Sequence, residues 1–240
     1  MNQNSAFIWL PAIEAAGVRS PRTIMLPYDH LALVPMLDGG KPCAYFDTVV
    51  EHVKGLAEGR YPVFLRTDLS SAKHDGPKAY LAKGPEDVKQ VLFNLLMDNE
   101  MKFFMSARPM GIMIREFLEL DAAFTAFDGL PIAREWRLFV DGEKLLCAHP
   151  YWPAYALENC AGLPEGWEAM LEEHHREPPI VRAHLAREAI KVAKALGGEW
   201  SADFAQDKDG NWWLTDMATA RDSYHWPECE RIQTKHAEPA

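Results

Sequence analysis

Apolar residues recur at the helical spacing of three and four positions in several segments, and these segments predict helices. The strongest stripe runs through residues 84–99, where Pro85 lies near the expected first turn and acidic residues lie beside the N-terminus. A shorter helix is predicted over residues 5–16, with Ser5 as its N-cap and Gly17 at its end. Further helices are predicted over residues 45–57, 165–176 and 180–196.

Short runs bounded by turn residues predict strands over residues 23–26, 61–67 and 111–120. Two Asp-Gly pairs predict hairpins, because a two-residue type I′ turn favours Asp or Asn followed by Gly. One hairpin joins residues 133–140 and 143–149 about Asp141-Gly142, and the other is centred on Asp209-Gly210. Sheets built from hairpins with intervening helices predict an α+β fold rather than a doubly wound parallel sheet.

The order of the predicted elements divides the chain into three parts. We expect an N-terminal region over residues 1–60, a small lobe over residues 61–110 and a larger, hairpin-rich lobe over residues 111–240. A ligand is expected in a cleft between the two lobes, because binding sites favour such interfaces.

Composition narrows the classes of partner. With 35 acidic and 25 basic residues, the formal net charge is −10, which argues against nucleic acid or an anionic membrane surface as the main partner. No run approaches the roughly 18 consecutive apolar residues of a membrane span, and the first residues lack the basic region of a secretory signal. The four cysteines contain no C-x-x-C pair, so we expect reduced thiols, a cytoplasmic location and no zinc ribbon.

Asp203 and Asp216 are the leading candidates for a metal site. Each lies six residues from the Asp209-Gly210 turn, so a regular two-residue hairpin places them opposite each other, with Cβ atoms about 4.5–5.5 Å apart. Facing carboxylates repel unless a proton or a cation lies between them, and their hard oxygens suit Mg²⁺ bridged to nucleotide phosphates. The alternative is an exposed pair with both side chains in water. A longer loop would break the pairing.

A group of cationic and hydroxyl residues is a candidate phosphate site. Arg66 lies in an otherwise apolar predicted strand, where a cation needs an anionic partner. The loop that follows carries Ser70, Ser71 and Lys73, whose hydroxyl and ammonium groups can surround phosphates together with backbone amides. The Walker pattern is absent, and a solvated loop with exposed lysines is the alternative.

Strand alternation places Glu135, Arg137 and Phe139 on one face of the predicted strand 133–140. Arg137 is suited either to clamp a terminal phosphate or to pair with a neighbouring carboxylate. Arg115 and Glu116 lie in the middle of the predicted strand 111–120. Either they help to bind an adenine and a ribose at a hinge between lobes, or they reflect only the ordinary alternation of side chains between the two faces of a strand.

Two further groups carry weaker signals. His149 is a candidate base or substrate contact, with a partly buried structural histidine as the alternative. Asp222, Ser223, His225 and Cys229 lie close together near the end of the chain, but their spacing is not diagnostic of any site.

The order of these motifs resembles the ATP-grasp superfamily. Within it, the likeness is to the cell-division-cycle family that assembles a translation initiation factor, and to related phage and bacterial ATP-grasp domains. It covers roughly residues 60–220 and rests on the segments LSSAKHDG with GPEDVKQVL, EWRLFVDGEKLL and DFAQDKDGNWWLTDMA. The resemblance implies an ATP-grasp fold, in which two lobes with antiparallel-rich sheets enclose a nucleotide cleft.

By position, the resemblance also implies roles for the candidate residues. Arg66 would contact the nucleotide phosphates, and Ser70, Ser71 and Lys73 would lie on the loop that folds over them. Arg115 and Glu116 would line the adenine hinge, Arg137 would face the γ-phosphate, and Asp203 and Asp216 would hold Mg²⁺. Arg137 and Lys73 are the implied catalytic residues.

Two positions depart from the superfamily pattern. Arg66 replaces the usual lysine, and Ala218 stands where an asparagine or aspartate commonly adds a metal ligand, so that Asp222 is the nearest substitute. The implied function is an Mg-ATP-dependent ligase that joins a carboxylate to an amine or similar nucleophile through an acylphosphate, with a small-molecule, protein or peptide substrate. The alternatives are an ATP-binding assembly factor without ligase turnover, and a protein that binds no nucleotide.

Overall fold

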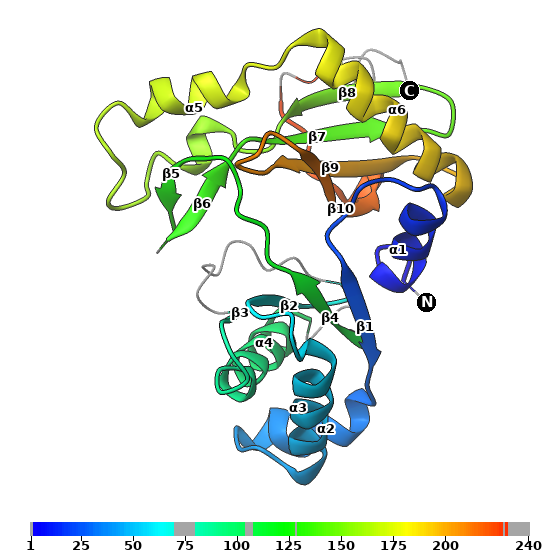
Figure 1. Cartoon of the computed structure of the whole chain (residues 1–240), viewed down its shortest axis with the longest axis vertical. Helices are drawn as coiled ribbons and strands as arrows, with labels where there is room; N and C mark the ends of the chain where they lie inside the picture. The colour runs from blue at the N-terminus through cyan, green and yellow to red at the C-terminus, as the bar shows by residue number, and fades with distance from the viewer. Residues whose placement is uncertain (1, 70–79, 104–107, 128, 228, 230–240) are drawn as a thin grey trace, which may run out of the picture.

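The computed structural model describes residues 2–69, 80–103, 108–127, 129–227 and 229 of the chain. It is built around two four-stranded antiparallel sheets, one above the other in Figure 1, and the chain crosses between them in short segments. The smaller unit has the strand order β1 (Thr23–Pro27), β4 (Gly111–Glu116), β2 (Val63–Thr67) and β3 (Leu81–Ala82). The larger unit has the order β10 (Trp212–Thr219), β9 (Trp200–Gln206), β7 (Glu135–Val140) and β8 (Leu145–Pro150).

Side chains alternate across the small sheet and give its two faces different roles. Val63 and Leu65 of β2, with Ile112 and Ile114 of β4, point into a core that three helices cover. Phe64, Arg66, Met113 and Arg115 therefore point to the opposite face, toward the larger unit. The covering helices are α2 (His30–Gly39), α3 (Ala44–Ala57) and α4 (Val88–Phe103), seen below the sheet in Figure 1.

The larger sheet is also covered on one face. Trp136, Leu138 and Phe204 lie in a second core with α6 (Pro179–Leu196) and α1 (Ala6–Ala15). Its other face carries Glu135, Arg137 and their neighbours, and it is turned toward the small unit. A third, smaller core joins the hairpin β5 (Ala122–Ala126) and β6 (Leu130–Ala133) to the 3₁₀ helix η3 (Ala154–Ala156) and α5 (Trp167–His175).

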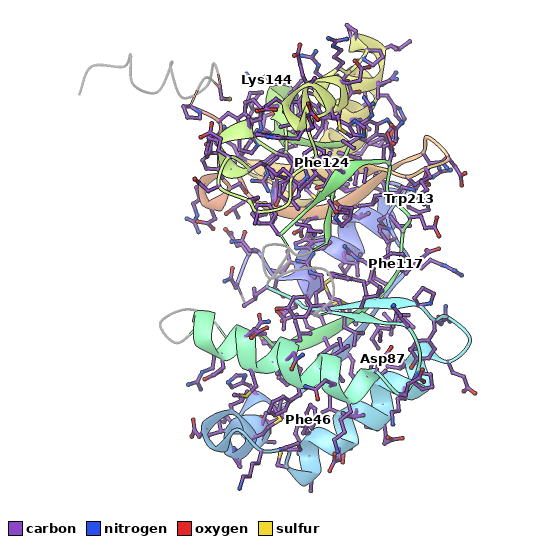
Figure 2. The ribbon with its side chains drawn as sticks, turned by 90° about the vertical axis from the view of Figure 1, so that its left-hand side faces the viewer. Phe46, Asp87, Phe117, Phe124, Lys144 and Trp213 are labelled. Atoms are coloured by element: carbon purple, nitrogen blue, oxygen red, sulfur yellow. The ribbon has the colours of Figure 1, made fainter. Side chains whose placement is uncertain are left out.

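The first sixty residues are shared between the two units. Helix α1 packs against α6 of the larger unit, whereas β1 pairs with β4, and α2 and α3 belong to the small core. Strand β4, which the sequence analysis assigned to the larger lobe, is hydrogen-bonded between β1 and β2. The chain thus crosses between the units twice, between α1 and β1 and again after Glu116. Figure 2 shows Phe117, on the second crossing, between the units.

Four of the predicted helices are confirmed within two residues at each end, namely those over residues 5–16, 45–57, 165–176 and 180–196. Ser5 is the N-cap of α1, where its side chain accepts a hydrogen bond from Phe7 N. The helix predicted over residues 84–99 instead begins at Val88 and continues to Phe103. The residues from Gly84 form a turn, closed by Asp87 N to Gly84 O, and the Asp87 carboxylate accepts from Lys83 N.

The strand predicted over residues 111–120 ends at Glu116. One α-helix and three strands were not predicted, namely α2, β3, β5 and β6, nor were the 3₁₀ helices η3 and η4 (Ala220–Asp222). Helix α2 contains Pro35, which lacks an N–H donor and normally disfavours a helix interior. Burial of Leu33, Met36 and Leu37 in the small core offsets that loss. Among the described helices, none combines the length and the apolar character needed to cross a bilayer.

Candidate functional site

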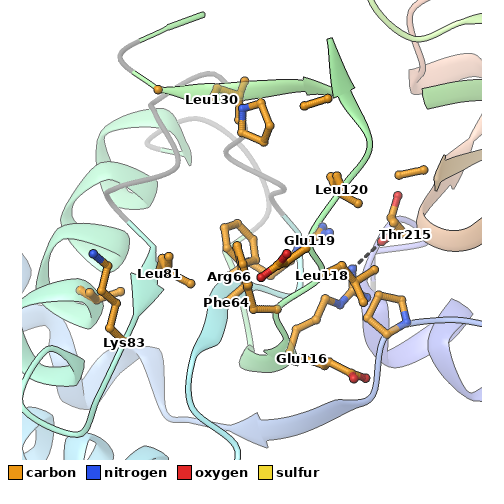
Figure 3. A pocket seen from close by; sticks show the side chains of 18 of the residues that line it. Phe64, Arg66, Leu81, Lys83, Glu116, Leu118, Glu119, Leu120, Leu130 and Thr215 are labelled. Atoms are coloured by element: carbon orange, nitrogen blue, oxygen red, sulfur yellow. Dashed lines mark hydrogen bonds between the residues drawn. The ribbon is translucent and has the colours of Figure 1, made fainter. Parts of the chain in front are cut away.

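A cleft with a volume of about 1030 Å³ separates the two units. Its walls are mainly apolar and come from both units, with Phe64 and Leu81 on one side and Leu130 on the other in Figure 3. Trp152, from the same core as Leu130, also lines it. The segment from Phe117 to Leu120 forms part of its wall, as Figure 3 shows for Leu118, Glu119 and Leu120. The volume lies at the upper end of the range of about 300–1,000 Å³ for small-molecule sites.

Two buried arginines are part of the wall of this cleft. Arg66 is 4% exposed and Arg115 is 6% exposed, and both line the cleft from the same face of the small sheet. The pKa of Arg115 is lowered to about 9, chiefly by burial and then by the nearby charge of Arg66, while Asp216 opposes the shift. Arg115 Nη1 donates to the backbone oxygen of Thr215, but its buried Nη2 has no acceptor among the described residues. An anion in the cleft would supply one.

Asp203 and Asp216 are opposite each other, as the sequence analysis predicted, but the hairpin that pairs them is not regular. The predicted type I′ turn at Asp209-Gly210 is wrong, because Asp207 N donates to Asn211 O and closes a loop of three residues. Of these loop residues, only Gly210 has a positive φ, at 81°. One extra residue in the loop should break the Asp203–Asp216 pairing.

A β-bulge at Thr215 restores the pairing. Leu214 pairs with Phe204, whereas Asp216 pairs with Asp203, so Thr215 is an additional residue in β10. Its hydroxyl donates to Asp203 O at 3.0 Å, and its carbonyl accepts from Arg115. The bulge therefore places the two aspartates together and also links the hairpin to the small unit.

The two aspartates are held by arginines from different units. Arg137 Nε and Nη2 donate to the two carboxylate oxygens of Asp203 at 2.7 and 2.8 Å. Burial opposes the charged form of Arg137, but Asp203 prevails and raises its pKa. Arg66 pairs with Asp216 Oδ1 at 3.3 Å across the boundary between the units. Asp203 is only 4% exposed, so the alternative of a solvated surface pair is wrong.

A second, smaller pocket of about 230 Å³ adjoins the cleft at Arg66, which lines both. Its wall is polar and includes Arg137, Asp216 and Asp222. Asp222 is held by Asn4 Nδ2 and Thr219 Oγ1, which donate to it at 2.9 and 2.6 Å. The largely apolar cleft and the pocket of charged groups thus meet at Arg66.

Asp216, which lines this pocket, and its cross-strand partner Asp203 fit Mg²⁺ when a phosphate is also present. Within the described chain, Asp203, Asp216 and Asp222 do not form a cluster with all three carboxylates within 4.8 Å of one another. The role of Asp222 as a substitute ligand for the position of Ala218 stays a prediction. Mg²⁺ usually retains several waters and takes only one or two carboxylates together with substrate phosphates. Asp203 and Asp216 meet that requirement, although each is engaged by an arginine.

The remaining predicted site residues fall into three groups. Ser70, Ser71 and Lys73 lie outside the described residues. The Glu116 carboxylate lines the cleft and accepts from Arg22 N and Nε at 3.1 and 3.3 Å. His149 is 7% exposed and stacks on Trp226 with ring centroids 5.4 Å apart, which favours the buried structural histidine. Burial is the main reason that its pKa is lowered.

Sequence reasoning missed several residues of the site. The role of Arg115 at an adenine hinge stays a prediction, but its contacts with Thr215 O and the nearby charge of Arg66 were not foreseen. The sequence analysis gave no role to Thr215 or to Glu135, which is 5% exposed and lines the cleft. The alternation of β2 and β4 was available in the sequence and places Arg66 and Arg115 on one face, but only if the pairing of these strands is known.

The fold matches known structures, although the sequence matches no protein-family model and no curated protein. The biotin carboxylase domain of 2-oxoglutarate carboxylase from Hydrogenobacter thermophilus, crystallised with MgADP, ADP and bicarbonate, superposes with a TM-score of 0.55 and 13% identity. That match covers 94% of this chain. The chain has an ATP-grasp fold. The predicted α+β class and ATP-grasp fold are therefore confirmed. Membership of the superfamily and the likeness to the cell-division-cycle family stay predictions.

Two further structures are similar over most of this chain. N5-carboxyaminoimidazole synthetase from Staphylococcus aureus has a TM-score of 0.49 at 10% identity over 93% of the chain. A RimK-domain ATP-grasp protein from Sphaerobacter thermophilus has a TM-score of 0.45 at 14% identity over 92% of it. The chain spans 41%, 46% and 60% of the three matched structures, in the order given.

Proposed function

We propose that this protein binds Mg-ATP between its two units and uses it to join a carboxylate to an amine or similar nucleophile. The observation that carries the proposal is the meeting of the apolar cleft and the charged pocket at Arg66, with Asp216 beside it. A nucleotide also has an apolar part and a charged part: its base is largely apolar and would suit the cleft, and its phosphates are anionic and would suit the charged pocket.

The arginines would provide most of the positive charge that binds the phosphates. Arg66 and Arg115 line the cleft, and Arg66 and Arg137 line the adjoining pocket. A phosphate chain running from the cleft into the pocket would pass all three guanidinium groups, and Arg115 Nη2 would gain an acceptor. Asp203 and Asp216 would hold Mg²⁺, which neutralises phosphate charge when bound. Lys73, with Ser70 and Ser71, remains proposed for the loop over the phosphates.

The reaction needs no protein nucleophile. A substrate carboxylate would attack the γ-phosphorus of ATP, release ADP and become an acylphosphate, which an amine would then attack with release of phosphate. Arg137 is placed to stabilise the transferring phosphoryl group, because preorganised cations are most effective where charge develops in a buried site. The charged pocket, with Asp222, Ser223 and Tyr224 at its wall, is the proposed position of the reacting groups.

The molecules bound in the matched structures are consistent with this proposal. One was crystallised with MgADP and bicarbonate, and others are described as an ATP-grasp ligase in complex with a precursor peptide. The substrate proposed here is accordingly a carboxylate, which a small molecule, a peptide or a protein can supply.

Calorimetry tests nucleotide binding directly. We expect Mg-ATP to bind the wild type, and Asp216→Asn to weaken binding at least tenfold, about 1.4 kcal/mol. Asp209→Asn, at an exposed position in the loop of the same hairpin, is the matched control and should bind as the wild type does. Absence of heat with the wild type, or equal affinity in Asp216→Asn, would contradict the proposed site.

An ATP-binding assembly factor without turnover is the second candidate. It is favoured by Ala218 at the usual position of a metal ligand and by the engagement of Asp222 with Asn4 and Thr219. Release of ADP in the presence of candidate carboxylates and amines separates the two functions. Turnover would support the ligase, and tight Mg-ATP binding without ADP release across a broad substrate panel would support the assembly factor.

A further inference from the structure

Two cysteines and a histidine converge on the cleft-facing side of the large sheet, beyond Arg137. Cys147 lies on β8, while His225 and Cys229 lie in the segment that follows β10. One ligating atom from each of the three lies within 4.8 Å of those of the other two. The sequence alone shows no diagnostic spacing for a metal site here, because most of the larger unit lies between Cys147 and the other two residues along the chain.

The fold builds this cluster from ordered contacts. The His225 ring stacks on Phe139, the cross-strand partner of Cys147, with ring centroids 3.4 Å apart. A turn in which Cys229 N donates to Trp226 O at 2.9 Å returns Cys229 to the sheet, where it is 8% exposed. Trp226 is itself stacked on His149. Stacking on Phe139 therefore positions His225, and this turn positions Cys229, beside Cys147 on β8.

The separations suit a tetrahedral ion. Zinc lies about 2.3 Å from a thiolate sulfur and about 2.0–2.1 Å from an imidazole nitrogen, so two such ligands of one ion are about 3.6 Å apart. Cys147 Sγ and His225 Nδ1 are 3.7 Å apart. Two thiolates would be about 3.8 Å apart around the same ion, so the limit of 4.8 Å on the remaining separations leaves about 1 Å of adjustment.

We propose that Cys147, His225 and Cys229 form a zinc site with two sulfur ligands and one nitrogen ligand. The donor set selects a borderline or soft ion and not Mg²⁺, which requires oxygen. All four cysteines carry thiols rather than disulfides, so both sulfur ligands are available to a metal. The site is chemically separate from the two aspartates and does not depend on nucleotide binding.

Such an ion would fasten the segment after β10 to the large sheet. Arg137 Nη1 donates to Tyr224 O at 3.3 Å, and Tyr224 is the neighbour of His225. Tyr224 also lines the charged pocket. The zinc site would therefore hold one wall of the proposed reaction pocket in place.

Metal content and Co²⁺ spectroscopy of the full chain test the proposal. We expect the reduced wild type to bind one Zn²⁺ per chain and its Co²⁺ form to show thiolate charge-transfer and tetrahedral d–d bands. Cys147→Ser, Cys229→Ser and His225→Ala should each weaken binding at least tenfold and alter these bands. Cys43→Ser and Cys160→Ser, at the two other thiols, should change neither measurement. Zinc should raise the Tm of the wild type but not that of Cys229→Ser.

Three results would overturn the proposal. They are the absence of bound Zn²⁺ and Co²⁺ in the reduced wild type, an equal loss of metal in the two control variants, and metal binding that survives all three site substitutions. A Cys147–Cys229 disulfide in protein that takes up no metal after reduction would assign the pair to redox chemistry instead. If Cys147→Ser does not fold, His225→Ala and Cys229→Ser, which lie outside the strands, still decide the outcome.

Discussion

Glu177 lies between α5 and α6 with both carboxylate oxygens buried and without a hydrogen-bond partner among the described residues. Burial raises its pKa from 4.5 to about 7, although Arg182 and Arg134 oppose the shift. The folded protein therefore binds more protons than the unfolded chain between these two values. As the pH rises through that window, the free energy of unfolding decreases, and above it the penalty is constant.

Glu177→Gln should remove this penalty. We expect the substitution to stabilise the protein at pH 8 by roughly 1–3 kcal/mol and to have little effect at pH 5, because one pKa unit corresponds to about 1.36 kcal/mol and partial exposure screens the charge. Urea unfolding at both pH values measures the difference. Glu173→Gln, at an exposed position in the preceding helix, is the control. A stabilisation that does not change with pH would show that ionisation is not its cause.

At the scale of an element, the loop of the last hairpin depends on Asp207. Its carboxylate accepts from Asp209 N, Asn211 N and Trp213 Nε1, the last at 2.7 Å. Burial alone would raise the pKa of Asp207, but the hydrogen bonds from Trp213, Asn211 and Asp209 lower it below its usual value. Its stabilising effect is thus present above the unfolded pKa and lost as the pH falls through the lower, folded value.

Asp207→Ala should reduce the free energy of unfolding by about 1–3 kcal/mol at pH 7, because it leaves several donors without their acceptor. The difference from the wild type should shrink in acid. Asp209→Ala, at the exposed loop position two residues later, should change stability much less. Urea denaturation of the three proteins provides the comparison, and equal midpoints at pH 7 would refute the assignment of Asp207 as the residue that closes the loop.

The same hairpin shows how far sequence reasoning extends. Counting residues from Asp209-Gly210 gave the correct partners, Asp203 and Asp216, from an incorrect turn. The loop is one residue longer than expected, and the bulge at Thr215 compensates for it. A bulge depends on contacts that no local pattern encodes, here the bonds of Thr215 to Asp203 and Arg115.

The other elements also differ in whether local sequence or tertiary contacts determine them. Helices with a clear apolar stripe, such as α6, were predicted from local spacing, whereas α2 required knowledge of the core that offsets Pro35. The β5–β6 hairpin was missed although its Asp-Gly pair at positions 128 and 129 was a usable signal. The cluster of Cys147, His225 and Cys229 could not be predicted from the sequence, because only the tertiary structure brings β8 next to the segment after β10.

At the scale of the whole molecule, the candidate site is divided between two units that contact each other through charged groups. Arg66 of the small sheet pairs with Asp216 of the large one, and Arg115 reaches the backbone of Thr215. The carboxylates proposed to hold Mg²⁺ are thus the groups that hold the proposed phosphate-binding arginines. Binding of either ligand alone would leave charged groups without partners, whereas binding of both would exchange one set of ion pairs for another.

This exchange predicts that Mg²⁺ and ATP bind cooperatively. We expect the affinity for ATP to be at least tenfold higher with Mg²⁺ than with EDTA, a coupling of about 1.4 kcal/mol, and the affinity for Mg²⁺ to rise by the same factor when ATP is present. Asp216→Asn removes a carboxylate from the exchange, so its coupling should be markedly smaller, while Asp209→Asn should retain the full effect. Calorimetric titrations of all three proteins, with and without the metal, give the coupling directly. Equal coupling in the wild type and Asp216→Asn would mean that the metal contacts the nucleotide alone and that the arginine–aspartate pairs have a purely structural role.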